Sequence, residues 1–222
     1  MKTLIFDEID STNNYAKTLP DGKEDVVIVA KRQTGGRGSK GRSFISETGG
    51  IYLSFLRFDA VKTENAFSIM ANAAVAVVKT LAAFGIDGGI KWPNDVFVGG
   101  KKICGILIEN VFSGDTVHRS VTGIGLNVNN PIAAEIGDIA VSMKEISGKE
   151  FPLKDVLATL VYNLTLPTDM EYYAEKSIIL GKEITVVKDG SEYSAVADEI
   201  LGDGRLKLKS GEILSAAEVT IK

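Results

Sequence analysis

The sequence predicts an α+β protein with a strand-rich main body and a small β-barrel at its C-terminal end. Short strand-type runs lie on both sides of one long helical segment, residues 64–84. Residues 179–222 contain only short strand-type runs, which glycine turns separate. The length of 222 residues suits one large domain and one small domain. We therefore expect a main domain over residues 1–178 and a β-barrel domain over 179–222.

The first half of the chain alternates between strand-type and helical patterns. The expected elements are strands over 2–8, 26–30 and 51–58, and helices over 11–19 and 64–84. Residues 26–30 are a continuous apolar run, which is typical of a buried strand. Thr63 is expected to cap the long helix, and Gly85 follows its end.

The second half begins with two strand pairs and ends with the β-barrel. The expected strands are 90–92, 96–98, 101–109, 116–128, 183–187, 193–200, 205–209 and 219–221, with helices over 152–164 and 170–176. Residues 93–95 suit a tight turn because proline, asparagine and aspartate favour turn positions. Gly99 and Gly100 predict a two-residue hairpin loop.

The composition excludes several classes of protein. With 45% hydrophobic and 24% charged residues, the chain can bury a core, so wholesale disorder is excluded. One cysteine, Cys104, and one histidine, His118, cannot build an intrachain disulfide framework or a structural zinc site. The single histidine also argues against most Ser-His-Asp chemistry. A net charge of −4 provides no overall field that would attract nucleic acid or acidic lipid.

The sequence also bears on location. Acidic residues follow the N-terminus before an apolar signal region could form. The longest apolar stretch, residues 66–78, contains Ser68 and Asn72 and is too short to span a bilayer. We therefore expect a cytoplasmic protein without a membrane partner.

The most unusual segment is the glycine-rich loop, residues 35–42. It contains a G-x-G-x-x-G pattern from Gly36 to Gly41. Dinucleotide and P-loop sites need a helix directly after the glycines, and residues 44–50 have no helical pattern. The segment can be a solvated flexible loop or an anion-binding loop. Four glycines and three cations in eight residues favour anion binding, because backbone N–H groups and guanidinium groups can converge on one ligand.

Five segments, in order, carry a family resemblance. They are Ser11-Thr12-Asn13, Gln33 to Arg42, Lys91-Trp92-Pro93-Asn94-Asp95, Lys102 to Leu107, and Gly123 to Asn127. Together they resemble biotin–protein ligases over residues 1 to about 130, and the terminal β-region resembles theirs too. The resemblance implies a mixed sheet packed against helices, like that of class II aminoacyl-tRNA synthetases, with an SH3-like C-terminal barrel. It also implies a monofunctional ligase without an N-terminal DNA-binding domain.

The resemblance implies a two-step reaction. Biotin is adenylated by ATP to biotinyl-5′-AMP, and a lysine of a biotin carboxyl carrier domain then accepts the biotin. ATP, Mg²⁺ and biotin are the implied cofactor and substrates, and no DNA partner is expected. A homodimer is an open option.

The resemblance also assigns site residues. The implied catalytic cations are Lys102, Arg37 and Arg42. The implied biotin-binding residues are Ser11, Thr12, Asn13, Gln33, Gly36, Arg37, Gly38, Ser39, Lys102, Gly105 and Leu107. The implied ATP-binding residues are Arg37, Ser39, Arg42, Phe44, Asn94, Asp95, Lys102, Leu126 and Asn127, with Asp95 as a Mg²⁺ contact.

Several roles have a structural alternative. Ser11 can act as a helix N-cap, and Trp92 is expected in the core. Lys102 either extends its stem from the strand end to solvent or pairs with a ligand anion.

In a regular strand Lys102 and Leu107 face opposite sides, so a shared pocket requires a bulge, for which Gly105 is the expected place. Ser39 departs from the family pattern, which commonly has Arg there.

Two other functions compete with this interpretation. A lipoate ligase could have the same fold, and a nucleic-acid-binding module could use the basic loop. The two motifs around residues 36–42 and 91–95 disfavour the first, and the net charge disfavours the second. We also expect the glycine-rich loop to be mobile in the free protein and ordered by biotin or biotinyl-AMP.

Overall fold

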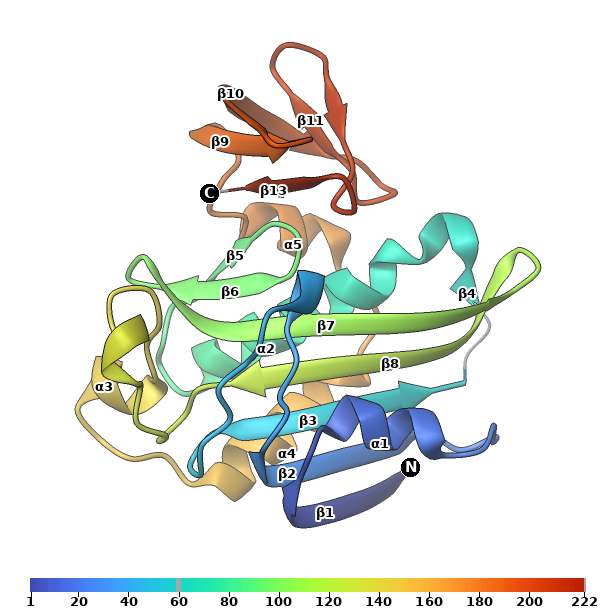
Figure 1. Cartoon of the computed structure of the whole chain (residues 1–222), viewed down its shortest axis with the longest axis vertical. Helices are drawn as coiled ribbons and strands as arrows, with labels where there is room; N and C mark the ends of the chain where they lie inside the picture. Colours follow the sequence, from blue (N-terminus) through green and yellow to red (C-terminus); the bar gives the residue numbers. More distant parts are fainter. Residues whose placement is uncertain (59–60, 222) are drawn as a thin grey trace.

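The computed structural model describes residues 1–58 and 61–221, and two β-sheets organise them (Figure 1). The larger sheet has the strand order β1-β2-β3-β8-β7-β6-β5, and β4 pairs with β8. Its strands are β1 (Lys2–Ile9), β2 (Val26–Gln33), β3 (Ile51–Arg57), β4 (Val61–Lys62), β5 (Gly89–Lys91), β6 (Asp95–Val98), β7 (Lys101–Ser113) and β8 (Thr116–Leu126). β1 and β2 run parallel, whereas the other described pairs are antiparallel. The predicted mixed sheet is therefore confirmed.

Helices cover both faces of this sheet. They are α1 (Thr12–Thr18), α2 (Phe67–Ala83), α3 (Met143–Ser147), α4 (Leu153–Leu164) and α5 (Met170–Glu175). In Figure 1, α1 lies in front of the sheet, and α2 and α4 lie behind it. Successive side chains of β2 point to opposite faces of the sheet, so the strand packs against helices on both faces. Val27 and Val29 belong to the main core, whereas Ile28 packs in a smaller cluster with Ala16 of α1. The predicted helix packing against the sheet is thus confirmed.

The start of the long helix differs from the prediction. Thr63 does not cap it, because residues Thr63–Asn65 form a 3₁₀ turn and α2 begins at Phe67. The backbone N–H of Ala66 donates to the Thr63 carbonyl, so the chain enters the helix through this turn.

The segment Thr63–Ala83 is long and apolar enough to cross a membrane by length and composition, contrary to the expectation for residues 66–78. Most of it is buried inside the protein, as in the core helix of a globular domain.

A second, antiparallel sheet lies near the C-terminus. It comprises β9 (Glu183–Lys188), β10 (Ser191–Ile200), β11 (Leu206–Leu208), β12 (Ile213–Leu214) and β13 (Val219–Ile221), in the order β12-β11-β10-β9-β13. The prediction of a small C-terminal β-region is confirmed, and the short strand β12 adds to it. Its classification as an SH3-like barrel and the boundary at 178/179 stay predictions.

The second sheet is attached to the main body by core packing. One continuous cluster of buried side chains contains residues of both sheets, such as Ile90 of β5 and Val186 of β9. The buried Trp92 side chain donates from Nε1 to the carbonyl of Gly204, at 2.8 Å. Trp92 is therefore a core residue, as predicted, and it joins the turn before β6 to the C-terminal sheet.

Candidate active site

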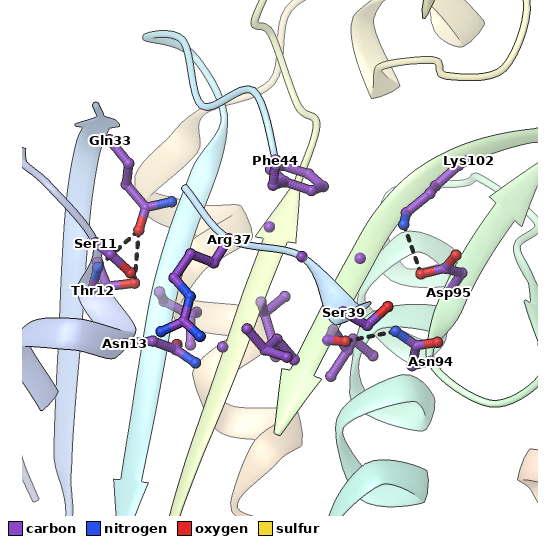
Figure 2. A pocket seen from close by; sticks show the side chains of 18 residues that line it. Ser11, Thr12, Asn13, Gln33, Arg37, Ser39, Phe44, Asn94, Asp95 and Lys102 are labelled. Carbon is purple, nitrogen blue, oxygen red and sulfur yellow. Dashed lines mark hydrogen bonds and ion pairs between the residues drawn. The ribbon is translucent and has the colours of Figure 1, made fainter. Parts of the chain in front are cut away.

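A pocket opens where α1, the glycine-rich loop and the strands β6, β7 and β8 meet (Figure 2). It is lined by Ser11, Thr12, Asn13, Gln33, Arg37, Gly38, Ser39, Phe44, Leu53, Asn94, Asp95, Lys102, Gly105, Ile106, Leu107, Gly123, Ile124 and Gly125. In Figure 2 the residues of α1 and Gln33 lie on one side, and Lys102 and Asp95 lie on the other. The pocket therefore has a polar end and a charged end, with a glycine-rich and apolar floor between them.

The polar end begins at the N-terminus of α1. Ser11 is the N-cap, as its alternative role predicts, and its hydroxyl accepts from the N–H of Asn14. The Gln33 carbonyl Oε1 accepts from the backbone N–H of Thr12 at 2.8 Å and from the Thr12 hydroxyl at 3.1 Å. Gln33 Nε2 donates to the hydroxyl of Ser46 at 2.9 Å, and this bond fixes the orientation of the Gln33 amide. Capping does not exclude a ligand role, because Ser11 also lines the pocket.

Asn13 is held between two strands. Its Oδ1 lies 2.5 Å from the hydroxyl of Ser54, a fully buried residue on β3, and its Nδ2 donates to Glu109 of β7 at 2.9 Å. Glu109 also contacts Lys17 and Arg37. Burial acts to raise the pKa of Glu109, but the hydrogen bonds and the two cations outweigh it and hold the pKa below its ordinary range. Glu109 is therefore an anion at neutral pH.

Glycines form the floor of the pocket. Gly123 and Gly125 lie on the same face of β8, and Gly105 of β7 pairs with Gly125. A Cβ on Gly123 would approach Oδ1 of Asn13 to 2.2 Å, and one on Gly125 would approach the ring of Phe44 to 2.6 Å. The absence of side chains at these positions therefore allows the Asn13 amide and the Phe44 ring to approach the strand closely.

A bulge places Lys102 in the pocket. Val96 of β6 pairs with Cys104, but the next pair is Phe97 with Lys102, so Ile103 is an additional residue on β7. The predicted bulge therefore lies at Ile103 and not at Gly105. It brings Lys102 to the pocket shared with Leu107, with its Nζ near Gly105.

Lys102 pairs with an acidic neighbour. Its Nζ lies 2.7 Å from Oδ1 of Asp95, and both side chains are only partly exposed, at 32% and 21%. Burial lowers the pKa of the nearby Lys91, as do the charges of Lys102 and Arg42, while Asp95 acts to raise it. Lys91 and Arg42 thus add positive charge beside the pair of Lys102 and Asp95.

The glycine-rich loop folds back along itself over the pocket. Gly38 N–H donates to the Arg42 carbonyl at 2.7 Å, and Phe44 N–H donates to the Gly36 carbonyl at 2.9 Å. At its tip, Lys40 donates to the carbonyl of Val219 at 2.7 Å and to Thr220 at 3.0 Å. The loop therefore contacts the C-terminal sheet. Its mobility without ligand stays a prediction.

Most predicted site residues meet in this pocket. The exceptions are Gly36, Arg42, Leu126 and Asn127, which do not line it. Arg42 lies against Ser39, and the Asn127 amide is buried, donating to Val141 and accepting from Asn130. The ligand roles implied for all these residues stay predictions.

Sequence reasoning missed two groups of residues. Leu53, Ile106 and Ile124 supply apolar floor, and Ser54 and Glu109 hold Asn13 from outside the pocket. A polar Ser54 inside the apolar run 51–58 was the available signal. The partner of Glu109, 96 positions away, leaves no local trace in the sequence.

Comparisons of sequence and structure relate this chain to known proteins. A family model described as biotin/lipoate A/B protein ligase family matches residues 5–127. The chain is 38% identical over 162 residues to the bifunctional ligase/repressor BirA of Bacillus spizizenii, covering 69% of this chain and 50% of that protein. It is 30% identical over 219 residues to a biotin–[acetyl-CoA-carboxylase] ligase of Mycobacterium tuberculosis, covering 88% and 79%.

A solved structure is similar over the whole chain. It is the biotin protein ligase of Aquifex aeolicus in complex with biotin and ATP, with 27% identity, a TM-score of 0.84, and coverage of 100% of this chain and 98% of that one. The chain spans about half the length of the first curated relatives that it matches. Because the family model matches more than half of the sequence, this chain belongs to the biotin/lipoate A/B protein ligase family.

Proposed function

We propose that the chain is a biotin–protein ligase, which adenylates biotin with ATP and transfers biotin to a lysine of a biotin carboxyl carrier domain. The observation that carries this proposal is the two-ended pocket. Fixed donors and acceptors around Thr12, Asn13 and Gln33 suit a polar ureido ring. Leu53 and Ile124 suit the apolar part of the ligand, and Lys102 suits its carboxylate. The names of the relatives and of the Aquifex complex support the same substrates.

The first step would join two anions. A carboxylate oxygen of biotin attacks the α-phosphorus of ATP, an O–P bond forms, and the bond to the pyrophosphate leaving group breaks. The protein's contribution is then to position the reactants and to offset their charge repulsion. Lys102 is the cation best placed for this role, because it lines the pocket and already faces a carboxylate, Asp95, at 2.7 Å. Arg37 also lines the pocket, and Arg42 lies at its edge, beside Ser39.

The residues present fit a magnesium ion bound mainly by substrate phosphates. The described residues contain no group of three or more His, Cys, Asp or Glu side chains that could hold a metal. Mg²⁺ usually keeps several waters and takes one or two carboxylates in addition to phosphate oxygens. Asp95 is the acidic residue among the described lining residues and would supply that carboxylate. The ion would neutralise phosphate charge.

In the second step the neutral amine of a carrier lysine attacks the carbonyl carbon of biotinyl-AMP. An amide bond forms, AMP leaves with the bonding electrons, and the amine nitrogen loses one proton to water. We expect the acceptor to be one lysine of a carrier domain, and we expect the reaction to take place in the cytoplasm. A lipoate ligase would use the same two steps, so the acid that is activated decides between the two functions.

The test is pyrophosphate release from ATP in the presence of biotin, lipoate or octanoate. We expect release to depend on biotin, and we expect biotin to be transferred to a carrier domain but not to its Lys→Arg variant at the acceptor position. Equal turnover with lipoate or octanoate would contradict the proposal. Release without any added acid would mean that water attacks the α-phosphorus and gives AMP, which would contradict the proposal.

A further inference from the structure

Glu109 contacts several site segments without lining the pocket. It lies on β7 opposite Val121 of β8. Its carboxylate accepts from Nδ2 of Asn13 at 2.9 Å and lies 3.0 Å from Nζ of Lys17 and 3.5 Å from Nη2 of Arg37. These donors come from two segments, α1 and the glycine-rich loop. The side chain of Glu109 is 24% exposed, so these contacts are partly shielded from solvent.

The first consequence concerns the amide of Asn13. An ionised carboxylate only accepts hydrogen bonds, so the group that faces Glu109 must be the NH₂ of Asn13. The carbonyl Oδ1 then faces Ser54, whose hydroxyl can donate to it. An inverted amide would place its oxygen against a carboxylate and its NH₂ against Ser54. Glu109 therefore selects one of the two amide orientations at the polar end of the pocket.

The second consequence concerns the glycine-rich loop. Nη1 of Arg37 donates to Oδ1 of Asn14 at 3.0 Å, and the other terminal nitrogen faces Glu109. The guanidinium thus connects the loop to α1 and β7. Figure 2 shows the Arg37 side chain directed toward Asn13. Without the carboxylate, the side chain of Asn14 would be the remaining partner of this cation among the contacts of the described residues. Lys17, which contacts the same carboxylate, would then repel it.

We propose that Glu109 is a positioning residue that orients the Asn13 amide for the ligand and anchors the glycine-rich loop through Arg37. This proposal rests on the proposed biotin ligase function, because biotin is the ligand whose polar ring Asn13 would meet. Glu109 does not line the pocket, so it acts through residues that do. Its two tasks can be separated, because Asn13 needs an acceptor and Arg37 needs a negative charge.

Two variants separate these tasks. Glu109→Gln keeps an amide oxygen that can accept from Asn13 but removes the charge, whereas Glu109→Leu removes both. We expect biotin affinity, measured by titration calorimetry, to fall by about tenfold or more in Glu109→Leu and by less than about threefold in Glu109→Gln. We expect amide exchange of residues 35–42 to accelerate in both. The matched control is Glu150→Gln, which removes the exposed charge partner of Lys144 away from the pocket and should change neither quantity.

The outcomes distinguish this proposal from the proposed function. If the wild-type chain binds no biotin, the proposed function fails. If the wild type binds biotin and a folded Glu109→Leu variant binds it equally well, the positioning role is overturned. A Gln variant as weak as the Leu variant would mean that biotin affinity depends on the negative charge of Glu109, which would overturn the separation of the two tasks. Thermal denaturation of each variant establishes that the fold is retained, and the Gln variant keeps the test valid if the Leu variant does not fold.

Discussion

At the level of single residues, the cations near the pocket have partners within the protein itself. Lys102 faces Asp95, Arg37 faces Asn14 and Glu109, and Lys40 contacts the C-terminal strand. An anionic ligand must therefore displace or share these contacts when it binds. The net binding free energy is then the difference between the hydrogen bonds that the ligand makes and those that it replaces. Such a pocket favours ligands that replace several of these partners at once.

Lys102 is the residue for which this exchange matters most. We expect Lys102→Ala to retain the fold, since the ion pair is partly solvated, and to cost about 2–5 kcal/mol in transition-state stabilisation of adenylation. Pyrophosphate release with biotin and ATP measures the loss. The matched control is Lys101→Ala, whose side chain instead donates to the Gly137 carbonyl at 2.6 Å. A folded Lys102→Ala variant with unchanged adenylation would favour the alternative in which Lys102 only extends its stem toward solvent.

Ser39 supports a prediction about how firmly the intermediate is held. Ser39 lines the pocket where the family commonly has Arg, and a neutral hydroxyl bond is worth about 0.5–1.5 kcal/mol against about 1.5–3 for a charged one. Lys40 is engaged with Val219 and Thr220, so Arg42, which lies against Ser39, is the nearer substitute. We expect Ser39→Arg to slow the dissociation of preformed biotinyl-AMP by roughly 5–30-fold at fixed ionic strength.

The control for this measurement is Ser43→Arg, which adds the same charge at the exposed position directly after the glycine-rich loop. It should leave the off-rate nearly unchanged, because its guanidinium would remain in solvent. Equal off-rates for wild type and Ser39→Arg would mean that another cation already fills the position.

At the level of elements, the strands β7 and β8 give the pocket its shape through residues that lack side chains. Gly125 admits the ring of Phe44, and Gly123 admits the amide of Asn13. The bulge at Ile103 turns Lys102 into the same space. A loop, a helix and a lysine thus meet on one face of two adjacent strands, because that face leaves room for them.

Gly125 provides a direct test of this packing. In Gly125→Ala the new methyl group would lie within 2.6–3.0 Å of three Phe44 ring atoms, so the ring must move. We expect a loss of about 1–3 kcal/mol in the free energy of unfolding, measured with urea. The loss should shrink in a Phe44→Leu background, where the side chain is smaller. Gly202→Ala is the control, since nothing lies within 4 Å of its added Cβ and the change should be nearly neutral. Equal losses in both backgrounds would argue against the contact.

The same elements indicate how far the sequence alone leads. Apolar runs such as 26–30 and the turn at Gly99 and Gly100 were predictable, because their signals are local. The need for a bulge near Lys102 followed from strand alternation, but its position did not, since the pairing of β6 with β7 decides it. The contact of Glu109 with Asn13 depends on how α1 docks on the sheet, which no local pattern encodes. The cap at Thr63 was wrong because a 3₁₀ turn replaced the first helical turn.

At the level of the whole molecule, the C-terminal sheet supports the charged half of the pocket. Trp92, which directly precedes the turn with Asn94 and Asp95, donates to the carbonyl of Gly204. Lys40 of the glycine-rich loop donates to the carbonyl of Val219 on β13. The core is continuous between the two sheets. Two regions that differ in sequence character are therefore mechanically connected at the segments that we propose to contact ATP. This connection predicts that the chain unfolds as one cooperative unit.

Trp92→Phe tests this connection. The variant keeps most of the buried ring but removes the indole N–H, which leaves the buried Gly204 carbonyl without its donor, at a cost of about 1–3 kcal/mol. We expect the urea midpoint to fall while unfolding remains a single transition. Circular dichroism must follow it, because Trp92 is the only tryptophan in the chain. Tyr162→Phe, which alters an exposed ring, should leave the midpoint unchanged. Two separate transitions in the wild type would instead mean that the C-terminal sheet is an independent domain. A urea midpoint of Trp92→Phe equal to that of the wild type would mean that this hydrogen bond does not connect the two sheets.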